Sequence, residues 1–182
     1  MVERLKDFMK VAATLSMEDY LEQFPHPMFF YSESKAALDA FVHTQLVDTI
    51  RASDGSKHID RFSEQLDNFV PLLPNTRPNR EFPQKAFIGR HTRRDFVINH
   101  STVSNRHACL FCDKRKDEYK LVDSGSTNGT MVRGRSLEPG VPISLRDGDV
   151  VTFGRVSFIF FSPKGAYRYL HQYRLFREAM QR

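Results

Sequence analysis

Three short clusters of residues carry side chains that can hold an anion. They are Gly89-Arg90, Ser104-Asn105-Arg106-His107 and Thr127-Asn128-Gly129-Thr130. Arginine offers a planar fork of donors that suits two phosphate oxygens at once, and the serine and threonine hydroxyls add further donors. Strand-like stretches separate the clusters, so we expect them at loop ends. The combination predicts a site that recognises a phosphorylated residue on another protein and holds the phosphate without hydrolysing it.

The chain that must position these clusters changes character near residue 66. After that point short apolar stretches alternate with turn residues such as Pro74-Asn75 and Asp147-Gly148. Pro71 cannot donate to a ladder, so the first strand is expected at a sheet edge. Such short, evenly spaced strands favour a sandwich of antiparallel sheets. The predicted strands are 69–73, 85–89, 95–98, 107–112, 119–123, 130–132, 150–153 and 156–161.

The remaining parts of the chain have mainly helical patterns. Residues 3–15 and 35–50 space their apolar residues by three and four, as amphipathic helices do. Ser16 followed by Asp19 predicts a helix start, and Pro25 ends that helix. Residues 28–31 form a short apolar run that suits a strand or an extended packing segment. The resulting division is a helical N-terminal region (1–65), a sandwich domain (66–163) and a C-terminal helix (164–182) that packs on the sandwich or on the N-terminal helices.

The motifs resemble the signature of forkhead-associated (FHA) domains. The resemblance covers about residues 66–163 and rests on four motifs in the family's order. They are Phe87-Ile88-Gly89-Arg90, Val103-Ser104-Asn105-Arg106-His107-Ala108, Asp123-Ser124-Gly125-Ser126-Thr127-Asn128-Gly129-Thr130 and Asp147-Gly148-Asp149-Val150-Val151-Thr152-Phe153-Gly154. It implies a mainly β, eleven-strand FHA-like sandwich whose loops at one end bind phosphothreonine.

The resemblance also implies a role for each site residue. Arg90 would hold the phosphate, Ser104 and Thr127 would donate hydroxyl hydrogen bonds to it, and Asn105 would touch the phosphate or the peptide. Asn128 would bond the ligand main chain, while Gly89, His107 and Gly129 would support the loops. The residue three after the phosphothreonine would be read by residues 99–103 and 131–135.

Other kinds of site fit the pattern less well. Ser104 and His107 suggest a nucleophile and its base, but the sequence places no carboxylate to orient the histidine. Cys109 and Cys112 form a CxxC, yet residues three apart on a strand point to opposite faces and cannot share a metal or a relaxed disulfide. The glycines at 125 and 129 precede no Lys-Ser/Thr pair, so a nucleotide P-loop is excluded. We therefore predict no catalytic residue, no metal, no cofactor and no enzymatic activity.

Composition is that of an ordinary soluble globular protein, and the charge is unevenly spread along the chain. The chain is 40% hydrophobic and 27% charged, and it has no apolar run long enough for a membrane span and no apolar core of a signal peptide. Its two cysteines fit a reducing cytosol. Residues 66–182 hold 20 Lys/Arg against 11 Asp/Glu, whereas residues 1–65 hold 7 against 11, so the second part favours anionic partners.

Two functions follow from these observations. The first is a phosphothreonine-dependent adaptor in a bacterial cytoplasm, whose partners are proteins phosphorylated by a Ser/Thr kinase. The second is a phosphorylation-independent scaffold that uses the sandwich or the N-terminal helices. Nucleic-acid binding is less favoured, because Lys114-Arg115-Lys116 is flanked by acidic residues and the strand aromatics fit a core better than a base-stacking surface.

Overall fold

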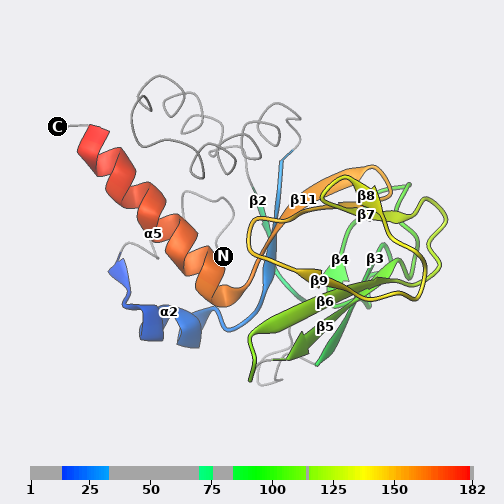
Figure 1. The fold of residues 1–182 in the computed structure, drawn as a ribbon, viewed down its shortest axis with the longest axis horizontal. Helices are drawn as coiled ribbons and strands as arrows, with labels where there is room; N and C mark the ends of the chain where they lie inside the picture. Colours follow the sequence, from blue (N-terminus) through cyan, green and yellow to red (C-terminus); the bar gives the residue numbers. More distant parts are fainter. Residues whose placement is uncertain (1–13, 33–69, 76–83, 114, 181–182) are drawn as a thin grey trace. The chain divides into compact units, whose positions relative to one another are not determined.

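The computed structural model describes residues 14–32, 70–75, 84–113 and 115–180. Over this part of the chain it contains two helices and eleven strands (Figure 1). The helices predicted over 3–15 and 35–50 lie outside the described residues. The elements are α2 (Met17–Gln23), β1 (Met28–Tyr31), β2 (Val70–Leu72), β3 (Lys85–Gly89), β4 (Phe96–Val97), β5 (Ala108–Asp113), β6 (Glu118–Asp123), β7 (Thr130–Val132), β8 (Arg135–Ser136), β9 (Ile143–Leu145), β10 (Val150–Phe153), β11 (Val156–Phe161) and α5 (Pro163–Met180).

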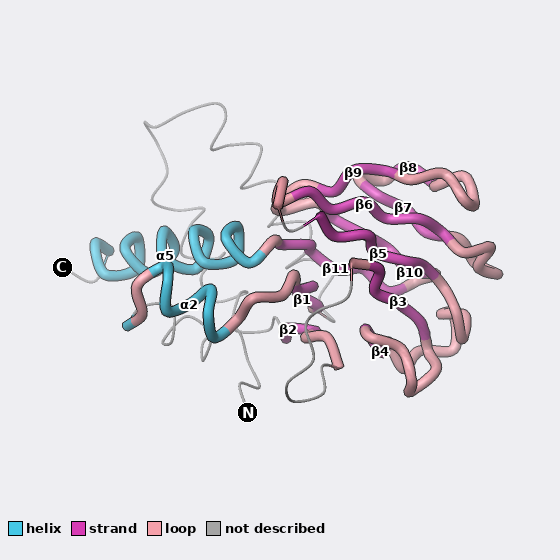
Figure 2. The backbone as a smooth tube through the Cα atoms, turned by 90° about the horizontal axis from the view of Figure 1, so that it is seen from below, coloured by secondary structure: helices cyan, strands magenta, loops and turns pink. Residues whose placement is uncertain are grey.

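The strands form two sheets, which confirms the predicted sandwich (Figure 2). One sheet has the order β2-β1-β11-β10-β7-β8 and the other the order β4-β3-β5-β6-β9. Strand β2 lies at an edge, as Pro71 predicted. The prediction of antiparallel pairing fails for one pair, because β3 and β4 are parallel, with Ile88 opposite Phe96. The alternation of residues along a strand does not reveal the direction of its neighbour.

All eight predicted strands are present, four of them with the predicted bounds. Strands β3, β7, β10 and β11 match residue for residue, and the run at 28–31 is a strand rather than an extended packing segment. The prediction omitted β8 and β9, which have two and three residues and include polar or exposed positions. Strands this short carry too little alternation to be recognised from sequence.

The core of the sandwich is rich in phenylalanine. The ring of Phe29 in β1 is fully buried and lies edge-on to Phe96 in β4, with the ring centroids 5.1 Å apart. It also contacts Phe153 at 5.8 Å and Phe160 at 5.5 Å. Edge-to-face and tilted contacts at these distances are favourable beyond the area that they bury. A residue from the N-terminal part of the chain therefore completes the core beneath the site-bearing strands.

The two helices belong to a compact unit separate from strands β3–β11. Ser16 caps α2 as predicted, because its Oγ accepts a hydrogen bond from the backbone N–H of Asp19 at 3.1 Å. Pro163 occupies the first position of α5, where its missing N–H leaves no intrahelical bond unmade. The rings of Tyr20 and Tyr167 lie 5.3 Å apart, so the C-terminal helix packs on the N-terminal one. Neither described helix has the length and hydrophobicity of a membrane-crossing segment.

Replacing Phe29 by alanine tests this description of the core. We expect Phe29→Ala to lower the free energy of unfolding by about 3–5 kcal/mol, since it removes a buried ring and leaves a cavity. Val141→Ala is the control, because Val141 is 48% exposed and its truncation should change stability by no more than about 0.5 kcal/mol. Urea unfolding followed by circular dichroism measures both. Equal effects of the two substitutions would contradict the assignment of Phe29 to the core.

Candidate functional site

The second and third clusters meet through two hydroxyl side chains. Ser104 Oγ lies 3.4 Å from Thr127 Oγ1 and donates to it, and it accepts the backbone N–H of Thr127 at 3.1 Å. The two residues are 23 positions apart in the sequence. The loop between β4 and β5 and the loop between β6 and β7 are therefore in direct contact, with two hydroxyls side by side.

The first cluster joins the second through the backbone. The N–H of Arg90 donates to the carbonyl of Ser104 at 3.0 Å. Gly89 is required here, because a Cβ on it would lie 2.5 Å from the carbonyl oxygen of Asn105. The side chain of Arg90 is exposed, and among the described residues its guanidinium has no hydrogen-bond or ion-pair partner. All three clusters thus lie close together, joined by the backbone hydrogen bond from Arg90 to Ser104 and by the contact between the Ser104 and Thr127 hydroxyls.

His107 holds the same two loops together from inside. It is fully buried, its Nδ1 accepts the N–H of Ser104 at 3.0 Å, and its Nε2 lies 3.1 Å from the carbonyl of Gly129. Because Nδ1 is an acceptor, the ring proton is on Nε2 and is donated to Gly129. Burial lowers the pKa of His107 and outweighs Gly129 and Asp123, which raise it. Both nitrogens are engaged with backbone groups, so the ring is no base for the Ser104 hydroxyl.

A buried carboxylate organises the loop that carries Thr127. Asp123 accepts the N–H groups of Gly125 and Ser126, both at 2.9 Å, and the hydroxyls of Ser126 at 2.7 Å and Thr130 at 2.5 Å. Burial raises the pKa of Asp123, but these hydrogen bonds more than offset it, so its pKa lies below the ordinary value. Asp123 lies in the third sequence motif, but no role in the site was predicted for it. An acid at a strand end followed by Ser, Gly and Thr was the signal available.

Asn128 connects the loop between β6 and β7 to the loop between β4 and β5. Its Nδ2 donates to the carbonyl of Thr102 at 2.8 Å, and the hydroxyl of Thr102 accepts the N–H of Arg155 at 3.1 Å. The backbone at Gly129 has a φ of +75°, the left-handed conformation predicted for this glycine. The amide oxygen of Asn128 lies at the surface, where it is an acceptor oriented by the bond that the amide nitrogen makes.

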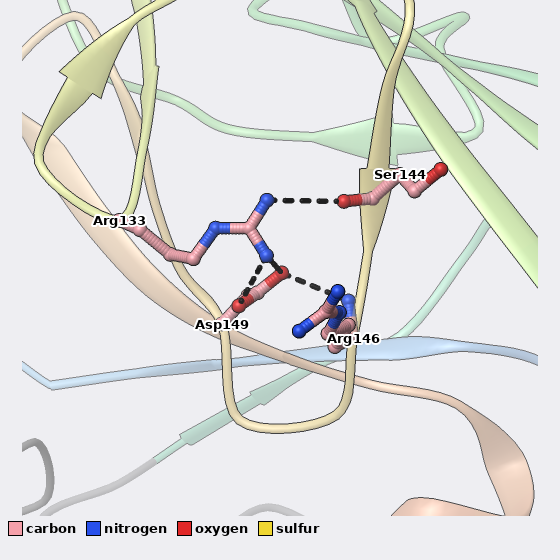
Figure 3. A network of polar contacts seen from close by, with 4 residues as sticks. All are labelled: Arg133, Ser144, Arg146 and Asp149. Atoms are coloured by element: carbon pink, nitrogen blue, oxygen red, sulfur yellow. Dashed lines mark hydrogen bonds and ion pairs between the residues drawn. The ribbon is translucent and has the colours of Figure 1, made fainter.

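One part of the sequence-based assignment is wrong. Residues 133–135 were expected to read the ligand, but they follow the far end of β7. The N–H of Gly154 bonds the carbonyl of Gly129 at the site end, whereas the N–H of Arg133 bonds the carbonyl of Val150 at the other end of β10. Figure 3 shows Arg133 held between the carboxylate of Asp149, at 3.1 Å, and the carbonyl of Ser144, at 3.3 Å. Its guanidinium therefore joins neighbouring hairpins through hydrogen bonds.

The two cysteines of the CxxC form no disulfide with each other. Cys109 and Cys112 are both buried and free, and Cys109 Sγ lies 3.5 Å from Ser124 Oγ.

Arg94 was not identified from the sequence, yet its Nε donates to the carbonyl of Asn105 at 2.9 Å. That bond fixes the backbone of a predicted site residue. No motif position marks Arg94, since only the folded loop brings it to Asn105.

The sandwich thus brings the loops that carry Arg90, Ser104, Thr127 and Asn128 into contact with one another. The FHA domain family model matches residues 86–154 of the chain. These residues form an FHA domain.

Comparison with known proteins finds several similar chains. The chain is 38% identical over 72 residues to an oxoglutarate dehydrogenase inhibitor of Corynebacterium jeikeium, which covers 40% of this chain and 46% of that protein. It is 36% identical over 77 residues to the glycogen accumulation regulator GarA of Mycobacterium tuberculosis, covering 42% and 44%. The matches therefore span less than half of either relative. The N-terminal FHA domain of S. cerevisiae Rad53p, solved with a phosphothreonine peptide, has a TM-score of 0.41 at 26% identity and covers 48% of this chain and 77% of that one.

Substitution of Gly89 tests the close approach of the two loops. We expect Gly89→Ala to displace the backbone at Asn105 and to lower the free energy of unfolding by about 1–3 kcal/mol, as overpacking does. Gly134→Ala is the matched control, since its φ of +73° brings strain but its Cβ would meet nothing within 4 Å. Amide NMR shifts of Ser104 and Asn105 should move in the first variant and not in the second. Unmoved shifts in Gly89→Ala would show that the approach is looser than described.

The pH dependence of stability tests the neutral state of His107. Its folded pKa lies below the ordinary value near 6.5, so the imidazole is neutral in both states at higher pH. As the pH falls below about 6.5, the unfolded chain takes up a proton that the folded chain resists, and the stability due to His107 is lost.

We therefore expect the stability difference between the wild type and His107→Gln to shrink between about pH 7.5 and pH 5.5. Taking this difference cancels the titration of all other groups that the two proteins share. Urea unfolding at the two pH values measures it. A difference that grows as the pH falls would mean that the folded protein holds the imidazolium form.

Proposed function

We propose that the FHA domain of this chain is a phosphothreonine-dependent protein-binding module and that the protein is an adaptor in Ser/Thr kinase signalling. The contact between the Ser104 and Thr127 hydroxyls at 3.4 Å, beside the backbone bond from Arg90 to Ser104, carries the proposal. These groups converge from three loops on one exposed place. Such convergence is what a phosphate with three acceptor oxygens requires.

Each donor has a distinct task in the proposed complex. Arg90 supplies a permanent positive charge and two parallel donors to the phosphate, which has a charge of about −2 at neutral pH. The hydroxyl of Ser104 turns from Thr127 to a phosphate oxygen, and Thr127 donates its own proton to another. Asn105 follows Ser104 with an exposed amide and contacts the phosphate or the adjacent peptide. No group in this set activates water, so the phosphate is bound and not cleaved.

Asn128 sets the register of the ligand in this proposal. Its amide nitrogen is engaged with the carbonyl of Thr102, which orients the amide oxygen as an acceptor for a ligand N–H. The supporting residues Gly89, His107 and Gly129 make no ligand contact. They keep the two loops at the spacing that the donors need, through the close approach at Gly89 and the two hydrogen bonds of the imidazole.

The partners of the protein are, on this proposal, threonine-phosphorylated substrates of a Ser/Thr kinase in a bacterial cytoplasm. Two bacterial relatives are named as an enzyme inhibitor and as a regulator, roles that suit a binding module without chemistry of its own. The division into residues 1–65, 66–163 and 164–182 is part of the same proposal. In it residues 1–65 are a helical N-terminal region of unknown role, residues 66–163 the FHA domain and residues 164–182 a C-terminal helix.

Peptide binding tests the proposed function directly. Fluorescence anisotropy with a phosphothreonine peptide library should find ligands that lose binding when they are dephosphorylated. Arg90→Ala should weaken binding by about 2 kcal/mol, a factor of roughly 30, as expected for one partner of a desolvated charge pair. Arg135→Ala is the matched control, because Arg135 is also exposed but lies in β8. The affinity of this variant for the phosphopeptides should stay unchanged.

Two outcomes would contradict the proposal. The first is no binding of any phosphothreonine peptide across a range of salt concentrations. The second is a partner that survives both phosphatase treatment and the Arg90→Ala substitution, which would indicate the phosphorylation-independent scaffold instead.

A further inference from the structure

Arg94 is held in place by two contacts that leave its charged end available. Its Nε donates to the carbonyl of Asn105 at 2.9 Å, and its guanidinium carbon lies 6.0 Å from the centroid of the Phe87 ring. The residue is only half-exposed. A guanidinium that stacks on a ring and bonds a carbonyl has a defined direction before any ligand arrives.

The two terminal amino groups of Arg94 are the donors that remain. Among the described residues neither of them has a partner. Arg133 gives the contrast, since both of its terminal groups are bonded, one to Asp149 and the other to Ser144. Because Arg94 is already ordered, a ligand that bonds it loses less side-chain entropy than one that must order a free arginine. Arg94 therefore has the properties of a prepared anion site.

The position of Arg94 places this site beside the proposed phosphate site. The carbonyl that it bonds belongs to Asn105, which follows Ser104 directly, and the same carbonyl lies next to Gly89. Two cations, Arg90 and Arg94, thus attach to the short segment Ser104-Asn105, one through its backbone and the other through its side chain.

The local charge also favours an anionic ligand over this segment. The connections on either side of β4 contain four arginines, namely Arg90, Arg93, Arg94 and Arg106, and one acid, Asp95. The carboxylate of Asp95 is engaged with the N–H of Phe87 at 2.7 Å. The surplus of positive charge raises the local concentration of acidic ligands and is largest for those with several charges.

We propose that Arg94 forms a second anion-binding subsite, which takes a carboxylate or a second phosphate close to the phosphothreonine. The inference rests on the proposed function and names its substrate class: threonine sites in acidic segments, or sites phosphorylated twice. Carboxylate and phosphate share the geometry that a planar fork of donors recognises.

A set of matched peptides tests the subsite on the full chain. One phosphothreonine peptide has neutral flanks, a second series has Asp at single flanking positions, and a third has a second phosphothreonine. The variants are Arg94→Gln and Arg93→Gln, which remove the same charge from the same loop. Arg93 contacts the loop through its backbone N–H, which donates to His91 Nδ1 at 3.1 Å. We expect one acidic position to strengthen wild-type binding by about three- to fivefold, the range of a partly exposed ion pair.

The pattern across the variants decides the outcome. Arg94→Gln should remove the gain from the acidic position, so that this variant binds the neutral and acidic peptides equally well, while Arg93→Gln should keep the gain. If Arg93→Gln and Arg94→Gln reduce the gain from the acidic position equally, the arginines act only through the general positive potential of the loop, and the subsite is wrong. If Arg94→Gln weakens the binding of the neutral and acidic peptides equally, Arg94 only positions the loop and the subsite is wrong.

Failure of the subsite is distinct from failure of the proposed function. If the wild type binds the neutral, the Asp-containing and the doubly phosphorylated peptides equally well, the second site is wrong and the phosphothreonine site stands. If the wild type binds none of the phosphopeptides, the proposed function and the second site fall together. A gain with the second phosphate but none with Asp would restrict the subsite to doubly phosphorylated ligands.

Discussion

The arrangement of the site depends on one buried imidazole between two loops. His107 accepts the N–H of Ser104 on one side and donates to the carbonyl of Gly129 on the other. Both groups are part-buried backbone groups, and leaving them unpaired would be costly. Only a neutral ring can accept at one nitrogen and donate at the other. The lowered pKa of His107 is therefore a consequence of the same burial that makes the bridge necessary.

The rest of the site follows from this bridge and from two local constraints. Asp123 turns the chain after β6 by accepting four hydrogen bonds, which presents Thr127 next to Ser104. Gly89 lets the end of β3 come so close to Asn105 that the N–H of Arg90 reaches the carbonyl of Ser104. Three loops that are distant in sequence are fixed by backbone contacts. The side chains of Arg90, Asn105, Thr127 and Asn128 are left exposed.

Much of this was predictable from the sequence because the relevant signals are local. The alternation in β3, β7 and β10, the cap at Ser16 and the positive φ at Gly129 each depend on a few consecutive residues. The three clusters were recognisable for the same reason, as runs of chemically suitable residues at strand ends. Their convergence was expected from the family resemblance, and the hydrogen bonds give it a physical basis.

What the sequence did not reveal depends on neighbours that are distant along the chain. The parallel direction of β4 and the short strands β8 and β9 are set by pairing and not by alternation. Arg133 was expected near the ligand, although the three residues of β7 carry it about 7–10 Å away from Thr130. Arg94 was missed for the converse reason: no motif includes it, and only the folded loop brings it to Asn105.

A crystal structure of the chain with a bound phosphothreonine peptide tests the central claim most directly. The account predicts the phosphate within hydrogen-bonding distance of the Arg90 guanidinium and of both the Ser104 and Thr127 hydroxyls, with His107 still bridging Ser104 and Gly129. A phosphate bound elsewhere on the sandwich, or one held by Arg90 while the two hydroxyls stay apart from it, would contradict the account.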